Sequence, residues 1–259
     1  MNARALVACF VLALGSAFVL WRIDVLPGWW DLTHWGIDVE AEAERARVAH
    51  RDARLNGFRS QAAAAQVAAF ESGVDQQRPY IVFLGSSTIE FWDLKASFPG
   101  VRAVNRGIGD EPAALLMDRL DVAIDWSAVQ GVVVYAASVD FRRLNEPPSE
   151  VLGRITRVLD AVQERAPGRP ILVLGLLSER EIKGTLRQDL TEVNARLKAL
   201  CAQRNLTFLP TDRAPLTRSD GTLSPAHSAD RLHLNADGYQ VLSDWIRKEG
   251  GPLVPLLFP

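Results

Sequence analysis

Short apolar runs alternate with longer amphipathic stretches along residues 80–248. A short apolar run that ends at a turn signal is typical of a strand buried in a parallel sheet, and a stretch of helical periodicity longer than about 10 residues indicates a helix packed on it. Strands are expected at residues 80–84, 101–105, 131–135, 171–177 and 206–210. Helices are expected at residues 112–124, 149–164, 186–203 and 236–248.

This alternation of strands and helices predicts a parallel sheet with helices on both of its faces. Five strands in this rhythm fit a flavodoxin-like, three-layer α/β/α sandwich. The predicted domain covers residues 78–250, and residues 251–259 are expected to form a C-terminal tail.

Residues 23–77 are expected to hold an aromatic-rich segment followed by a spacer helix at residues 39–72. One heptad seam of this helix contains Glu44 and Arg51 beside Phe58, so a coiled coil is not supported. We therefore expect a single helix that leads into the domain through a short linker at residues 73–79.

The N-terminal residues 5–21 carry no charge and lie between Arg4 and Arg22. As a helix they span about 25 Å, the short end of what a bilayer needs. Small residues at 15–17 offer a signal-peptide cleavage site. The apolar run continues past that site to Trp21, which favours an uncleaved signal-anchor with one transmembrane helix.

The orientation of this anchor follows from the Lys and Arg residues that flank it, which are nearly balanced. We expect a cytoplasmic N-terminus and an extracytoplasmic domain at the cell membrane. A secreted or periplasmic protein, released by signal cleavage, is the alternative. Trp29, Trp30 and Trp35 fit an interfacial aromatic belt, and packing on the domain is the other interpretation.

Composition excludes several classes of function. The 259 residues are 48% hydrophobic with a net charge of −2, so the basic face that nucleic acids require is not expected. Cys9 lies in the apolar N-terminus and Cys201 in a predicted helix, which argues against an intrachain disulfide. The His, Cys and acidic residues show no metal-ligand spacing, so no metal is expected.

The first predicted strand runs directly into Gly85-Ser86-Ser87, and a helical pattern follows. A hydroxyl at such a turn lies at the carboxyl edge of a parallel sheet, where open α/β folds bind ligands. The unpaired N–H groups that open the helix can stabilise developing negative charge. Ser87 is therefore a candidate nucleophile, and a helix N-cap is the other interpretation of a serine here.

Asp230 and His233 lie three residues apart near the other end of the domain, before Asn235, the expected N-cap of the last helix. A serine nucleophile needs a base within reach of its hydroxyl and an acid that orients the imidazole. His227 and Asp212 are the competing candidates for base and acid.

Together, Gly85-Ser86-Ser87 and Asp230-x-x-His233 resemble the SGNH, or GDSL-type, serine hydrolase family in its bacterial Gly-Ser-Ser branch. The resemblance covers residues 79–250, about two-thirds of the chain. It implies a flavodoxin-like fold and ester hydrolysis through an acyl-serine intermediate, without a cofactor. Ser87 would be the nucleophile, His233 the base and Asp230 the acid that orients it.

The resemblance also implies an oxyanion hole made by the N–H groups of Ser87 and Gly109. The family reads Gly-x-Asn-Asp after the third strand, and the Asn is a third donor. Asp140 matches the family Asp, which places Val139 at the Asn position without a donor. Losing one such donor typically lowers kcat by about 10²–10³. Candidates for a substitute donor are Ser138 and Arg142.

The sequence therefore predicts a serine esterase of the cell envelope that acts on small acyl esters, including O-acetyl groups on glycans. An O-acyltransferase would use the same residues and is one alternative. A degenerate hydrolase that binds a glycan or a partner without turnover is the other, and Val139 favours it. The acyl length, the natural alcohol and the oligomeric state do not follow from the sequence.

Overall fold

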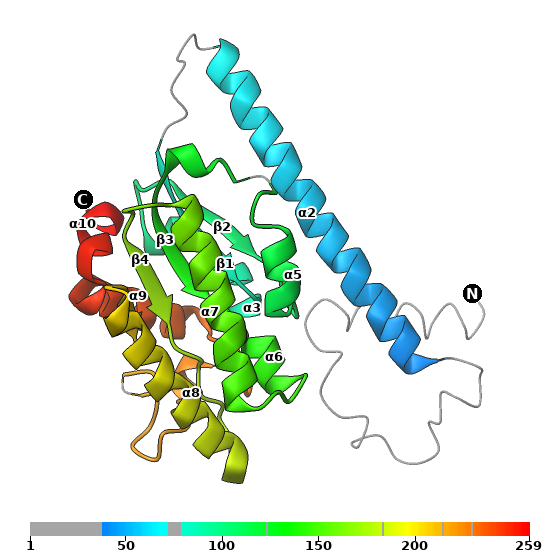
Figure 1. Cartoon of the computed structure of the whole chain (residues 1–259), viewed down its shortest axis with the longest axis vertical. Coiled ribbons are helices and arrows are strands. Elements are labelled where there is room, and N and C mark those ends of the chain that lie inside the picture. The colour runs from blue at the N-terminus through cyan, green and yellow to red at the C-terminus, as the bar shows by residue number, and fades with distance from the viewer. Residues whose placement is uncertain (1–37, 72–78, 123, 183, 214, 229) are drawn as a thin grey trace. The chain divides into compact units, whose positions relative to one another are not determined.

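The computed structural model describes residues 38–71, 79–122, 124–182, 184–213, 215–228 and 230–259 (Figure 1). The chain divides into two compact units between Gly57 and Phe58. The apolar segment at residues 5–21, Cys9 and the three early tryptophans lie outside the described residues. No helix within the described residues is long and apolar enough to cross a bilayer.

Helix α2 (Val39–Glu71) is the long helix predicted at residues 39–72. Oδ1 of Asp38 accepts the N–H of Ala41 at 2.9 Å and so satisfies one of the donors that every helix start leaves unpaired. On the exposed surface of the first turns, Glu42 pairs with Arg45 one turn later. Local capping and charge pairing thus support the helix that the composition predicted.

The five predicted strands form a parallel sheet in the order β2-β1-β3-β4-β5 (Figure 1). This is the flavodoxin-like order, and it confirms the predicted sandwich. Strand β4 ends three residues before its predicted end, because the N–H and carbonyl of Leu176 bond to the side chain of Asn194. The strands are β1 (Tyr80–Gly85), β2 (Ala103–Gly107), β3 (Val129–Tyr135), β4 (Ile171–Leu174) and β5 (Thr207–Leu209).

Helices cover both faces of the sheet (Figure 1). One layer holds helices α5 (Ala113–Asp118), α7 (Pro148–Arg165) and α8 (Gly184–Gln203), which contact one another in sequence. The other layer holds helices α9 (Ala236–Glu249), α4 (Leu94–Ser97) and α10 (Val254–Leu257). The connections between the strands are right-handed crossovers. The connection after β1 runs across the sheet in one direction and those after β2, β3 and β4 run in the other, so their helices lie on opposite faces.

Helix α5 ends six residues before its predicted end at residue 124. Arg119, its C-cap residue, is buried and pairs with the buried carboxylate of Glu111, with Nε 2.7 Å and 2.9 Å from the two oxygens. A buried charge requires such a partner, and the chain leaves the helix where this pair forms.

The predicted C-terminal tail is part of the fold. Its residues form a 3-10 turn (Gly251–Leu253) followed by α10. The side chain of Leu253 is buried over Gly131 of β3, where a Cβ atom would collide with it. The ring of Phe258 lies 5.4 Å from that of Phe98. The last residues therefore complete the layer that contains α9.

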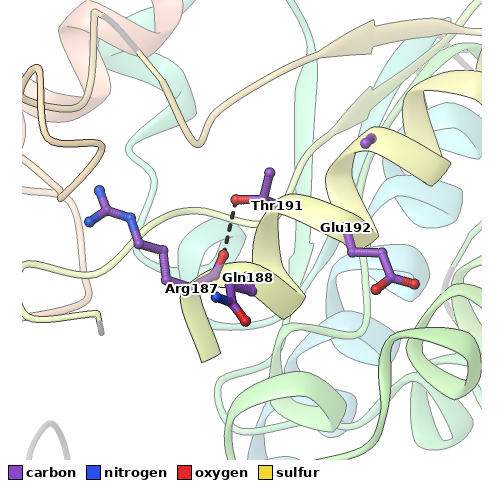
Figure 2. Close-up of a pocket in the computed structure, with 5 residues that line it drawn as sticks. Arg187, Gln188, Thr191 and Glu192 are labelled. Atoms are coloured by element: carbon purple, nitrogen blue, oxygen red, sulfur yellow. Dashed lines mark hydrogen bonds between the residues drawn. The ribbon is translucent and has the colours of Figure 1, made fainter. Parts of the chain in front are cut away.

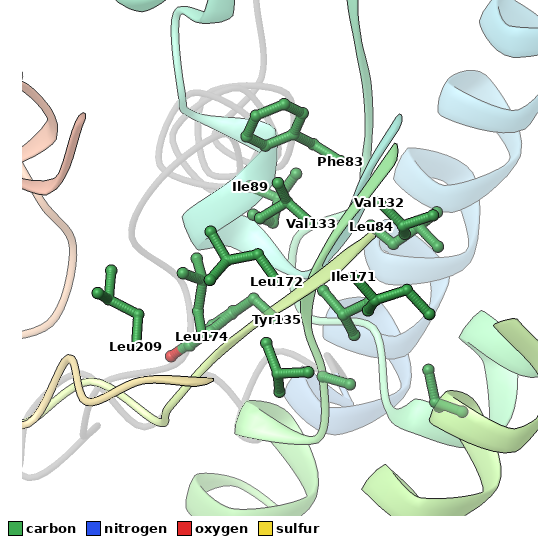
Figure 3. Packing of buried hydrophobic residues seen from close by; sticks show 14 of the residues in the cluster. Phe83, Leu84, Ile89, Val132, Val133, Tyr135, Ile171, Leu172, Leu174 and Leu209 are labelled. Carbon is green, nitrogen blue, oxygen red and sulfur yellow. The ribbon is translucent and has the colours of Figure 1, made fainter. Parts of the chain in front are cut away.

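The hydrophobic core lies on both faces of the central strands. Successive residues of β1, β3 and β4 point to opposite faces, as the pleat of a strand requires (Figure 3). Apart from the exposed Gln130 near the start of β3, these side chains are buried, which explains why the strands are apolar without alternation. The figure separates two rows: Phe83, Val133 and Leu172 on one face, and Leu84, Val132 and Ile171 on the other.

Candidate active site

Ser87, His233 and Asp230 form a continuous chain of hydrogen bonds. Nε2 of His233 lies 3.1 Å from Oγ of Ser87, and Nδ1 of His233 lies 2.7 Å from Oδ2 of Asp230. The side chains of His233 and Asp230 are 23% and 27% exposed, so a substrate can reach them. Residues predicted from opposite ends of the domain thus meet at one place.

Close backbone packing positions Ser87, the first residue of the short helix α3 (Ser87–Glu90). A Cβ atom on Gly85 would collide with the carbonyl of Tyr135, and one on Gly107 would collide with the backbone of Glu90. Glycine at both places lets α3 approach the ends of β1 and β2. The Oγ of Ser87 is therefore held at the carboxyl edge of the sheet.

Two polar side chains from different layers fasten α3. Nδ2 of Asn105, on β2, donates to the carbonyl of Ile89 at 2.6 Å. The hydroxyl of Tyr239, on α9, donates to the carbonyl of Thr88 at 2.8 Å. A four-residue helix is unstable by itself, so these bonds stabilise it. Sequence reasoning did not identify either residue, although an Asn at the end of an apolar strand was a visible signal.

The loop that carries Asp230 and His233 is held by its own polar groups. Oδ1 of Asp230 accepts the N–H groups of Leu232 and His233, both at 2.7 Å. Oγ of Ser228 lies 2.7 Å from the carbonyl oxygen of Asp230 and 2.8 Å from that of His233. The guanidinium of Arg180, in the loop after β4, donates to the same carbonyl of Asp230 at 3.2 Å. The imidazole is thus fixed in position.

Hydrogen bonding also keeps Asp230 ionised. Partial burial raises the pKa of this carboxyl group, but the hydrogen bonds from the His233 side chain and from two backbone N–H groups outweigh it, and the net pKa of Asp230 is lower than its ordinary value. An ionised carboxylate accepts the Nδ1–H of His233, which leaves Nε2 as the acceptor that faces Ser87. This is the tautomer that a general base requires.

Gly109, the predicted second oxyanion donor, bonds to an acidic side chain. Its N–H donates to Oε2 of Glu90 at 2.5 Å. Glu90 is the last residue of α3, one turn after Ser87. Gly109 therefore lies beside the nucleophile's helix, while its assignment to the oxyanion stays a prediction that requires the carboxylate to move. Sequence reasoning did not identify Glu90, although its i+3 spacing from Ser87 was visible.

The chain segment after β3 reaches the site in a strained conformation. Ala137 has φ 62° and ψ 19°, in the left-handed region, and helix α6 (Ser138–Arg142) follows it. Val139 is only 8% exposed. Asp140 is fully buried, and its Oδ2 accepts the N–H of Ala113 at 2.8 Å. Burial raises the pKa of Asp140 above its ordinary value, partly offset by that hydrogen bond. Asp140 thus ties α6 to the start of α5.

The two candidates for a substitute donor are bonded elsewhere. Oγ of Ser138 lies 2.7 Å from Oγ of Ser86. Nε of Arg142 donates to Oε1 of Glu179 at 2.7 Å, and its Nη2 donates to the carbonyl of Leu177. Within the described residues, neither side chain makes a hydrogen bond to Ser87 or His233. Each stays a candidate only if it breaks its present hydrogen bonds and donates to the oxyanion instead.

The competing base and acid do not join the triad. Nδ1 of His227 lies 3.4 Å from the carbonyl oxygen of Leu216. Asp212 has a side chain that is 10% exposed and lies 3.6 Å from Nε of Arg213. Within the described chain, neither His227 nor Asp212 bonds to Ser87, so the geometry favours His233 and Asp230.

The aromatic ring of Phe91 lies beside the candidate base, which the sequence did not predict. Its ring lies 5.1 Å from the imidazole of His233, at 66° to it, in an edge-to-face contact. Its side chain is 45% exposed although it is large and apolar. An exposed aromatic ring therefore borders the imidazole of the candidate base.

A shallow depression follows the surface of α8 (Figure 2). Thr191 donates its hydroxyl to the carbonyl of Arg187 at 2.9 Å there. All five lining residues come from one helix, and none belongs to the triad: Arg187, Gln188, Thr191, Glu192 and Ala195. Groups from several elements do not converge on it, so it is not the candidate site. Among the described residues, no group of three or more His, Cys, Asp or Glu side chains could hold a metal ion.

Known proteins are similar to this chain in sequence. The chain is 28% identical over 206 residues to human platelet-activating factor acetylhydrolase IB subunit alpha1. The aligned region covers 73% of this chain and 87% of that protein. It is 30% identical over 171 residues to the bovine alpha2 subunit, covering 63% of this chain and 72% of that one.

Solved structures share the fold at lower identity. A protein from Streptococcus pneumoniae described as a platelet activating factor has a TM-score of 0.66 and 22% identity, over 79% of this chain and 94% of that chain. An acetyl-xylooligosaccharide esterase from Geobacillus has a TM-score of 0.54 and 17% identity, over 67% and 94%.

The model of the GDSL-like lipase/acylhydrolase family matches residues 43–241, more than half of the chain. The match includes Ser87, Asp230 and His233. The chain therefore belongs to the GDSL-like lipase/acylhydrolase family, and ester hydrolysis is the reaction class that this membership assigns to it.

Proposed function

We propose that this protein is a serine esterase that hydrolyses small acyl esters, with Ser87 as nucleophile. The observation that carries the proposal is the unbroken chain of hydrogen bonds from Oγ of Ser87 through His233 to Asp230. Such a chain is the arrangement that activates a serine hydroxyl, which is otherwise a weak nucleophile at neutral pH.

The geometry supports a two-step reaction. Oγ of Ser87 attacks the ester carbonyl while Nε2 of His233 takes its proton. The tetrahedral intermediate then collapses, the alcohol leaves with the proton from Nε2, and the acyl group stays on Ser87. Water, deprotonated by Nε2, attacks the acyl-serine, and the carboxylic acid leaves as the proton returns to Oγ. Asp230 holds the imidazole and stabilises its protonated form throughout.

The backbone at the start of α3 supports charge stabilisation. The N–H of Ser87 is among the first of its helix, which have no partner inside the helix. Within the described residues it makes no hydrogen bond, so it is a candidate donor for the oxyanion. The Gly109 N–H is the second candidate, although it now bonds to Glu90. Val139 adds no donor at the third position, which favours slow turnover.

Acetyl esters are the proposed substrates. The names of two similar proteins refer to acetyl groups, on platelet-activating factor in one case and on a xylooligosaccharide in the other. The common element is a small acyl group on an alcohol. We extend this to O-acetylated glycans of the cell envelope, because the apolar segment at residues 5–21 supports a membrane anchor.

Hydrolysis by the purified full-length protein tests the proposal. We expect it to release p-nitrophenol faster from the acetate than from the octanoate, and to be labelled at Ser87 by a fluorophosphonate probe. No Ser87-dependent turnover and no labelling would instead support the second candidate, a binding protein without turnover. Val139 and the engaged Gly109 N–H favour that candidate, because two of the three family donors are then missing.

A further inference from the structure

Glu90 is an acidic residue that makes a direct bond inside the candidate site. Its carboxylate accepts the N–H of Gly109 at 2.5 Å, a charge-assisted hydrogen bond stronger than a neutral one. Glu90 and Ser87 are three residues apart on α3, so their side chains lie on the same face of that helix. The loop after β2 is thereby bonded to the face of the helix that carries the nucleophile.

The backbone around this bond is tightly fitted. Gly107 packs so closely on the N atom of Glu90 that no Cβ atom fits between them. Asn105 joins the two segments at the same place, since its Nδ2 donates to the carbonyl of Ile89 and its Oδ1 accepts the N–H of Gly107 at 2.9 Å. The Glu90–Gly109 bond is therefore one of several contacts that fasten the loop to α3.

The same loop is held from its other side by a second ion pair. Oδ1 of Asp110 lies 2.9 Å from Nε of Arg143, the residue that ends α6. Asp110 has φ 57°, in the left-handed region that costs energy for a residue other than glycine. Such a conformation persists only where neighbouring contacts impose it; Arg143 contacts Asp110 itself, and Glu90 bonds to the preceding residue, Gly109.

We propose that Glu90 is a positioning residue of the esterase site, whose carboxylate holds the loop at Gly109 and Asp110 in place against the helix of Ser87. This inference rests on the proposed function. While this bond holds, the Ser87 N–H is the candidate donor open to the oxyanion, and the Gly109 N–H joins it only when the carboxylate moves. The opposite possibility is a carboxylate that blocks the oxyanion site and must leave before an ester binds.

The two possibilities predict opposite effects of substitutions at Glu90. The amide oxygen of a glutamine still accepts the Gly109 N–H and carries no charge that would repel the oxyanion. Glu90→Gln is therefore expected to retain at least the wild-type kcat. Glu90→Ala removes the acceptor and frees the loop, and misplaced reacting groups cost up to about 10²-fold. We expect kcat to fall by about 10-fold to 10²-fold, with KM changed by less than about threefold.

The experiment compares the full-length wild type, Glu90→Gln and Glu90→Ala with p-nitrophenyl acetate, together with the melting temperature of each. Glu192→Gln and Glu192→Ala serve as matched controls, because Glu192 is exposed on α8 and outside the triad. The expected order of kcat is Glu90→Gln at or above wild type, with Glu90→Ala well below both. If Glu90→Ala fails to fold, Glu90→Gln decides alone: a folded Glu90→Gln variant below wild type overturns the inference.

A higher kcat in Glu90→Ala than in wild type would show that the carboxylate blocks the site. An unchanged kcat with a lower melting temperature would show a purely structural role. Either result overturns this inference while the wild type remains a Ser87-dependent esterase. Absence of Ser87-dependent turnover in the wild type overturns the proposed function itself, and this inference with it.

Discussion

Nε2 of His233 lies 3.1 Å from Oγ of Ser87, although 146 residues of sequence separate them. Replacing either residue should therefore remove nearly all esterase activity. Ser87→Ala lacks the nucleophile and His233→Ala lacks the base, and both are partly exposed, so the fold should tolerate the change. The measurement is hydrolysis of p-nitrophenyl acetate, with circular dichroism as a check on folding.

His227→Ala is the matched control for this prediction, because His227 is the competing histidine and does not bond to Ser87. We expect it to retain activity close to that of the wild type. Loss of activity in His227→Ala, with His233→Ala still active, would show that the base has been assigned to the wrong residue.

Asp230→Asn should lower kcat by about 10³–10⁴ while keeping the protein folded. The Asn Oδ1 can still accept the N–H groups of Leu232 and His233, but its amide faces Nδ1 with N–H donors and favours the wrong tautomer. Single-turnover acylation, followed as release of p-nitrophenol, measures the effect. A kcat within about threefold of wild type would contradict the role of Asp230.

The stability that the charge of Asp230 contributes should depend on pH in one direction. Its pKa is lower in the folded protein than in the unfolded chain, so the contribution is present above the ordinary value near 3.9 and is lost as the pH falls through the folded pKa. Urea unfolding at several pH values should show a constant free-energy difference between wild type and Asp230→Asn from pH 7 to about pH 5. A difference that disappears already near pH 6 would contradict the lowered pKa.

Ala137→Gly should stabilise the protein, because Ala137 occupies the left-handed region at φ 62°. That conformation costs an L-residue about 1–2 kcal/mol, while a glycine loses about 0.5–1 kcal/mol more entropy on folding. The net gain should be about 0.5–1 kcal/mol in the free energy of unfolding, measured in urea. Ala137→Val should have the opposite sign, and equal effects of the two substitutions would contradict the reason given.

Val139→Asn should raise kcat with little change in KM, because it restores an amide at the third donor position of the family. The bond would strengthen mainly in the transition state, and the gain is at most about 10²–10³. Val139 is 8% exposed, so an amide there costs stability, and the melting temperature must be followed. A lower kcat in a well-folded variant would mean that Val139 shapes the acyl pocket and that another group serves as the donor.

The membrane orientation is tested by fusing alkaline phosphatase after Pro259. That reporter is active only outside the cytoplasm, so we expect an active fusion. A fluorescent protein that folds only in the cytoplasm serves as the complementary reporter at the same position. Fluorescence together with an inactive phosphatase would reverse the proposed orientation.

The long elements could be predicted because their signal is local. The apolar runs that became β1 and β3 are buried on both faces, and the helical stretches that became α7 and α9 have strong 3.6-residue periodicity. Helices α6 and α10 were not predicted, because four or five residues are too few for a period, and the helix expected after Ser87, α3, ends already at Glu90. They form where tertiary contacts hold them, as the Asn105–Ile89 hydrogen bond holds α3.

The sequence by itself determined which groups can react, because Ser87, Asp230 and His233 lie in short motifs whose chemistry does not depend on the rest of the chain. Only the tertiary structure decided what surrounds them. In that structure the N–H of Gly109 donates to Glu90, the ring of Phe91 makes an edge-to-face contact with His233, and Ala137 adopts the left-handed conformation. These relationships depend on distances and backbone angles set where separate segments pack together, and periodicity within one segment carries no information about them.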